Sequence, residues 1–173
     1  MLSMMHETLS KTLSRGLWLC ALLLAGCAGP GITPLPAGAD EAALRQRWGE
    51  PSARYSLPAG SRLEYATGPY GLTTWMVDLD AAGRVLGAQQ VLTDRHLQAV
   101  QGRLPGMTRD ELLRVLGRPG ERRGGGWQGG EVWSWRYFNP FCLWFQVSIG
   151  DDGRVRDGAF GPDPRCDDIE EGR

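Results

Sequence analysis

The sequence predicts an α+β protein: a tandem repeat of units in which helices pack on an antiparallel sheet, preceded by a secretory signal. Two stretches of the chain align with each other, and in both the apolar residues change from helical spacing to the alternation of strands. These two observations predict the repeat. A third observation concerns residues 1–26, in which charged residues precede a short apolar run. This pattern separates them from the part of the chain expected to fold.

The N-terminus has the layout of a secretory signal. Lys11 and Arg15 precede an apolar run from Leu17 to Leu24. This run is about half of the roughly 20 residues that a helix needs to cross a bilayer, so it is too short for a permanent span. It leads into four residues that resemble the lipobox of bacterial lipoproteins: Leu24, Ala25, Gly26 and Cys27.

The lipobox resemblance implies how the chain is processed and where it goes. Residues 1–26 would be the cleaved lipoprotein signal peptide, and Cys27 would carry diacylglycerol and an acyl chain as its membrane anchor. No other cofactor is expected. Ala28, and not aspartate, follows the anchor, which implies transport to the outer membrane on the side that faces the periplasm. Residues 27–37 then form a Pro/Gly-rich tether.

The rest of the chain divides into two similar units, 38–93 and 94–162, and a polar tail, 163–173. Gly38–Pro51 aligns without gaps to Gly106–Pro119. After a two-residue insertion in a Gly-rich stretch, the apolar residues of the following strands also align. Residues 27–173 suit one modest domain, or two small ones that share a core.

Each unit is expected to begin with helices. Thr108 is a good N-cap, Glu111 completes a capping box with it, and Gly117 supplies the C-terminal stop. The first unit has its equivalent cap at Asp40. A further helix is expected from about Asp94 to Gln101.

Alternating apolar residues predict strands after the helices, and one-sided alternation predicts sheets with one buried face. The turn Asp151–Gly153 predicts a final hairpin in which Cys142 lies opposite about Gly161. The strands are expected near residues 63–65, 75–79, 85–92, 132–137, 145–149 and 154–160.

The cysteines indicate an oxidising compartment. Cys20 leaves with the signal and Cys27 is consumed by lipid, so Cys142 and Cys166 remain as a pair. The pair predicts a disulfide, and the alternative is two separate thiols. The bond would hold the start of the polar tail against the last hairpin.

The second unit resembles a known family. Gly106–Thr108, the Leu-Gly-x-Pro stop at Leu116–Pro119, and Trp/Tyr strands that end in an Asp-Gly-Arg-Val hairpin resemble the SmpA/OmlA/BamE family of small outer-membrane lipoproteins. The family unit, two helices on a three-stranded antiparallel sheet, is similar to the repeat of β-lactamase inhibitor protein. The resemblance covers about Thr93–Phe160 well and Gly38–Leu92 more loosely. It implies an accessory role in the machinery that assembles outer-membrane β-barrels.

Catalysis is not expected. His96 stands alone on its expected helix, where a histidine is usually solvated, and no spacing for a metal site or a G-x-S-x-G nucleophile occurs. The Gly-rich stretch has no following Lys-Ser/Thr, so it is not a phosphate loop. Charges are balanced, with 19 Lys+Arg and 20 Asp+Glu, and no basic cluster indicates nucleic acid as a partner.

Aromatic residues near loops indicate a protein-contact surface, although the same residues could instead cover the sheet. The expected function is a non-catalytic, periplasm-facing module that binds an envelope protein, such as a component of β-barrel assembly. The alternative is an envelope inhibitor or sensor of a periplasmic or secreted enzyme. A small-ligand carrier would need a deep polar pocket. The expected contact residues are Trp127, Phe138, Phe141 and Trp144.

Overall fold

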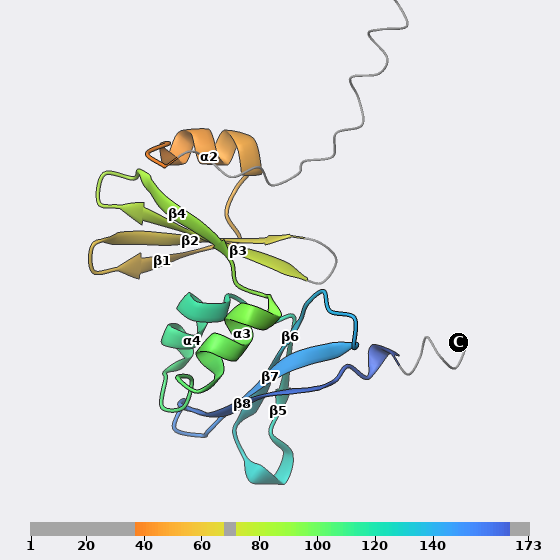
Figure 1. Cartoon of the computed structure of the whole chain (residues 1–173). Coiled ribbons are helices and arrows are strands. Elements are labelled where there is room, and N and C mark those ends of the chain that lie inside the picture. Colours follow the sequence, from red (N-terminus) through yellow and green to blue (C-terminus); the bar gives the residue numbers. More distant parts are fainter. Residues whose placement is uncertain (1–36, 68–71, 167–173) are drawn as a thin grey trace, which may run out of the picture. The chain divides into compact units, whose positions relative to one another are not determined.

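A computed structural model describes residues 37–67 and 72–166, all of which belong to one compact unit, Pro34–Arg173 (Figure 1). The fold is α+β, as the sequence predicts. It contains two antiparallel four-stranded sheets, and each has at least one helix packed against it. No helix in the described ranges is long and apolar enough to cross a membrane.

The first sheet has the order β1-β2-β3-β4, and helix α2 (Glu41–Trp48) packs on it (Figure 1). Leu44 of α2 is fully buried against the side chains that alternate toward the helix. These are Leu63, Tyr65, Val77, Leu79 and Val85. The strands are β1 (Ala53–Leu57), β2 (Gly60–Thr67), β3 (Thr73–Asp80) and β4 (Val85–Gln90).

The second sheet has the order β5-β6-β7-β8, and α3 (Asp94–Gln101) and α4 (Arg109–Leu116) pack on one of its faces. The core joins Leu97, Val100, Leu112 and Leu116 of the helices to Trp133, Trp135, Phe145, Val147 and Ile149 of the strands. The elements that follow α4 are β5 (Glu121–Gly124), the short 3-10 helix η2 (Gly126–Gln128), β6 (Glu131–Arg136), β7 (Leu143–Ile149) and β8 (Val155–Pro162).

Local capping explains where the helices begin. The Thr108 hydroxyl accepts a hydrogen bond from the Glu111 N–H at 3.3 Å, and the Glu111 carboxylate accepts one from the Thr108 N–H at 2.8 Å. This is the predicted capping box, and it satisfies two backbone donors that the first turn leaves unpaired. Asp40 caps α2 through the Ala43 N–H, as predicted.

Equivalent positions in the two halves have the same geometry. Gly38 and Gly106 both have φ 86°, and their N–H groups donate to the carbonyls of Val85 and Val155 at 2.9 and 2.8 Å. In each half the last strand of the sheet also has a β-bulge, with Leu86 of β4 as the extra residue opposite Asp78/Leu79 and Arg156 of β8 as the extra residue opposite Ser148/Ile149.

Three expectations about the sheets were wrong. Each sheet has four strands and not three, because β1 and β5 each add an edge strand. The β5 sequence, Glu-Arg-Arg-Gly, has no apolar residue, and the Ala-Arg-Tyr-Ser-Leu sequence of β1 alternates over only five residues. The last hairpin also has a different register. The bulge at Ser148/Ile149 and the turn that pairs Gly150 with Arg154 place Trp144 opposite Gly161, and Cys142 accepts a hydrogen bond from the Asp163 N–H.

The first sheet is buried on both faces, whereas one buried face was expected. On the face away from α2, Glu64 is fully buried and Met76 belongs to the core formed with α3 and α4. The Arg118 N–H, just after α4, donates to Glu64 Oε1 at 3.1 Å. The end of α4 therefore packs on the first sheet while the helix also covers the second.

Candidate functional site

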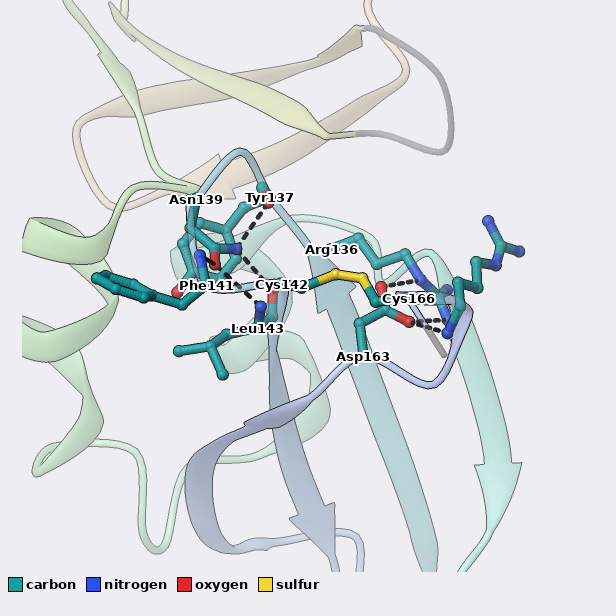
Figure 2. The surroundings of a disulfide bond; sticks show 9 residues. Arg136, Tyr137, Asn139, Phe141, Cys142, Leu143, Asp163 and Cys166 are labelled. Atoms are coloured by element: carbon teal, nitrogen blue, oxygen red, sulfur yellow. Dashed lines mark hydrogen bonds and ion pairs between the residues drawn. A yellow bond between two sulfur atoms is a disulfide. The ribbon is translucent and has the colours of Figure 1, made fainter. Parts of the chain in front are cut away.

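The connection from β6 to β7, residues Tyr137–Cys142, forms a contact loop with a defined conformation (Figure 2). Asn139 closes this contact loop from inside. Its Nδ2 donates to the carbonyls of Tyr137 and Leu143 at 3.0 and 2.7 Å, and its Oδ1 accepts from the N–H groups of Phe141 and Leu143 at 3.1 and 2.9 Å. One half-buried amide thus satisfies backbone groups at both ends of the contact loop, as Asn side chains do in tight turns.

A disulfide between Cys142 and Cys166 ties the contact loop to the segment after β8 (Figure 2). The two Cα atoms are 6.3 Å apart, within the usual range for bonded cysteines. Backbone hydrogen bonds hold the residues around the disulfide. The Asp163 N–H donates to the Cys142 carbonyl at 2.9 Å, and the Cys166 N–H donates to the Asp163 carbonyl at 3.0 Å. The disulfide and these backbone hydrogen bonds together restrict the position of the contact loop.

A buried ion pair lies beside the disulfide (Figure 2). Arg136 Nε donates to Asp163 Oδ2 at 2.7 Å, Nη2 donates to Oδ1 at 3.1 Å, and Nη1 reaches Glu121 at 3.1 Å. Burial lowers the pKa of Arg136, but the hydrogen bonds to the two carboxylates outweigh this and hold the pKa above its ordinary value. The bidentate pair fixes the segment that carries Cys166.

The contact loop presents two large apolar side chains to solvent. Phe138 is 68% exposed and Phe141 is 76% exposed. Phe141 borders a groove of about 350 Å³ between the contact loop, β8 and α3. Three of its six lining residues are aromatic, and the Tyr137 hydroxyl donates to Asp94 at 2.7 Å. The groove is lined by Asp94, Gln98, Tyr137, Phe141, Leu143 and Phe160.

This geometry is suited to binding an apolar side chain from another protein. A rigid loop exposes its aromatic rings at little entropic cost, because its conformation is already fixed before binding. The groove beside Phe141 offers a partly enclosed apolar site with one carboxylate, Asp94, at its wall. Buried aromatic anchors surrounded by polar residues carry most of the energy in protein interfaces.

The four expected contact residues do not form one surface. Trp127 is fully exposed in η2, before β6, whereas Phe138 and Phe141 follow β6. The six residues of β6 span about 20 Å, so these are separate sites. Trp144 was wrongly expected at the surface: it is only 3% exposed, because Arg136 and Arg123 lie over its ring at 4.7 and 5.3 Å.

Sequence reasoning missed the residues that hold the contact loop. Asn139 precedes Pro140, and an Asn-Pro pair is a turn signal that could have indicated this turn. Arg136 and Asp163 gave no signal, because their pairing depends on two strands meeting. His96 was expected to be solvated, but its Nε2 is buried and has no hydrogen-bond partner in the described part of the chain.

Cys27 and the rest of the lipobox, Leu24, Ala25 and Gly26, lie outside the described residues. Among residues 37–67 and 72–166, no group of three or more His, Cys, Asp or Glu side chains is placed to hold a metal ion. Comparison with protein-family models, curated proteins and solved structures gives no match.

Proposed function

We propose that this chain is an outer-membrane lipoprotein, facing the periplasm, that binds another envelope protein without catalysis. The observation that carries the proposal is the contact loop, in which a disulfide and Asn139 hold Phe138 and Phe141 out in solvent. Burying such a side chain is worth about 1.5–3 kcal/mol. A fixed loop that leaves two of them exposed is therefore best explained by a partner.

The anchor rests on the N-terminal sequence. The short apolar run and Leu24–Cys27 resemble a lipoprotein signal, and the tether 27–37 would place the folded unit near the membrane surface. The disulfide fits an oxidising compartment such as the periplasm.

The helix-on-sheet arrangement of each half supports the resemblance to the SmpA/OmlA/BamE family, whose assembly subunit has one such unit where two are proposed here. The matched helix ends, glycine conformations and bulges in the two halves favour two copies of one helix-on-sheet unit. In that family the unit serves as a small scaffold in β-barrel assembly, so components of that machinery are the first partners to test. The alternative function, inhibition of a periplasmic or secreted enzyme, is tested by the same capture experiment.

Affinity capture from solubilised membranes tests the contact. Phe141→Ala should lose the captured partner, while the matched control Leu86→Ala, which removes a 63% exposed apolar side chain from β4, should retain it. Capture of barrel-assembly components by the wild-type protein would support the scaffolding function. Capture of a single soluble hydrolase would instead support the function as an enzyme inhibitor. Equal capture by the two variants would rule out the contact loop as the binding site.

Cys27→Ser tests the anchor separately. Without the thiol, acylation cannot occur, and the precursor should stay uncleaved in the inner membrane. Membrane fractionation and the size of the protein measure this. A mature-sized protein in the outer membrane of that variant would refute the lipobox interpretation.

A further inference from the structure

Strand β4 is an unprotected edge of the first sheet. The outer N–H and C=O groups of an edge strand are unpaired, and native proteins usually protect them with charged residues, proline or a covering segment. β4 has the sequence Val-Leu-Gly-Ala-Gln-Gln, and Leu86 to Gln89 are all exposed. Its bulge lies near its start, at Leu86, so residues 87–90 keep a regular register with β3.

The other edge strands in the described part of the chain all contain charged residues, and one of them also contains a proline. β4 alone among the four has neither. The protecting residues are Arg54 in β1, Glu121, Arg122 and Arg123 in β5, and Arg156, Asp157 and Pro162 in β8.

The corresponding edge of the second sheet is covered by a helix side chain. Gly158 of β8 lies opposite Val147, as Ala88 of β4 lies opposite Val77. The Gly158 carbonyl accepts from Gln101 Nε2 of α3 at 2.8 Å, so it points away from β7. Because the two strands have the same bulge and the same register, the N–H and C=O of Ala88 point away from β3. Within residues 37–67 and 72–166, neither group has a hydrogen-bond partner.

The β4 edge is complementary to itself. In an antiparallel pair of two β4 strands centred on Ala88, the two Ala88 residues would exchange N–H···O=C bonds, and Gly87 would lie opposite Gln89. Glycine has no side chain, and a hollow of about 480 Å³ borders residues 87–89 on the face away from α2, so the long side chain of Gln89 has room there. No charges would meet in this pair, whereas self-pairing of β5 would bring its arginines together.

We propose that two copies of this chain pair through β4, in a symmetric antiparallel contact centred on Ala88. The first sheet of one copy would then continue into the first sheet of the other. A contact that uses the same surface on both copies is complete with two of them, so the product is a closed dimer and not a fibre. This inference does not depend on the proposed function, since β4 and the contact loop share no residue.

Sedimentation equilibrium of the full chain in density-matched detergent tests the pairing. Two strands of this length bury less than the roughly 1,200 Å² of a stable interface, so the dimer should be weak and reversible, with a Kd of roughly 1 μM to 1 mM. Ala88→Lys would place like charges opposite each other and should weaken the dimer at least about tenfold. Ala88→Glu should have the same effect for the same reason.

A mixture of these two variants separates lost pairing from damaged folding. Ala88→Lys together with Ala88→Glu should restore the dimer, because opposite charges then face each other across the pair. Ser56→Lys is the matched control, since it adds the same charge at an exposed position of the β1 edge. This control variant should dimerise with an unchanged Kd.

Three results would overturn the proposal. A wild-type chain that stays monomeric up to about 1 mM would show that the edge does not pair with itself. A dimer that Ala88→Lys leaves unchanged would place the contact elsewhere on the molecule. A mixture of Ala88→Lys and Ala88→Glu that stays monomeric would show that the substitutions act on folding and not across a pair of strands.

Discussion

Replacing Gly117 by Ala tests how closely the end of α4 packs on the first sheet. Gly117 has φ 76° and ψ −170°, a backbone region that is essentially limited to glycine. A Cβ at this position would lie 2.9 Å from Thr74 Cγ2, 3.0 Å from Glu64 Cδ and 3.1 Å from Met76 Cε. Ordinary contacts are 3.4–4 Å, so either these side chains or the helix end must move.

Gly49 is the matched control, because it ends α2 with φ 81° and ψ −164° and a Cβ there would meet no atom within 4 Å. Gly49→Ala should cost about 1–3 kcal/mol from backbone strain alone. Gly117→Ala should add about 1–3 kcal/mol of overpacking to the same strain. Glu64 cannot yield easily, since its carboxylate accepts from the Tyr55 hydroxyl and the Arg118 N–H.

Equilibrium unfolding in urea, followed by circular dichroism, measures both losses under one set of conditions. The free energy of unfolding should fall by about 2 kcal/mol more in Gly117→Ala than in Gly49→Ala. Equal losses would refute the reasoning, because they would leave only the shared backbone strain and no packing of α4 on the first sheet.

The remaining predictions concern the disulfide, the core and one surface carboxylate. Replacing Cys142 and Cys166 together by Ser should lower the free energy of unfolding by about 3 kcal/mol in the chain-entropy model; in urea unfolding, a variant as stable as the oxidised chain would contradict this. Val147→Asp puts a charge at a fully buried position and should abolish cooperative thermal unfolding, whereas an unchanged Tm would refute the strand's orientation. The Trp133 indole N–H, which donates to Glu131 at 2.6 Å, lowers the pKa of that carboxyl. Its contribution to stability is therefore present above the ordinary value of 4.5 and lost as pH falls through the lowered pKa; Glu131→Gln should flatten this acid limb of the stability curve, and an identical curve would count against the interaction.

The helices were predictable because their signals are local. The caps at Asp40 and Thr108 and the stop at Gly117 each act within one turn of the chain. In the structure α2 begins directly after Asp40, and α4 lies between Thr108 and Gly117. The helix predicted over Asp94–Gln101 is α3. Central strands were also visible, since alternation over β3 and β7 marks the side chains that reach the core.

The edge strands and the last register were not predictable in the same way. β5 has no apolar residue and owes its conformation to pairing with β6. β1 pairs with β2, and its short alternation of Ala53, Tyr55 and Leu57 with polar residues was not recognised as a strand. A bulge adds one residue to a strand without a clear sequence signal. The expected partner of Cys142 was therefore misplaced from Asp163 to Gly161, although the pairing of Cys142 with Cys166 needed only the count of cysteines.

The sequence by itself determined the helix ends, the core faces of the central strands and the residue types available for contact. Tertiary structure decided which of those residues are free to act. It covered Trp144 with Arg136 and Arg123, left Phe138 and Phe141 exposed, and brought His96 and Arg103 beside Arg62. The physical reason is that exposure depends on whatever covers a side chain, and the covering groups here come from strands and helices distant in sequence, whose approach no local pattern encodes.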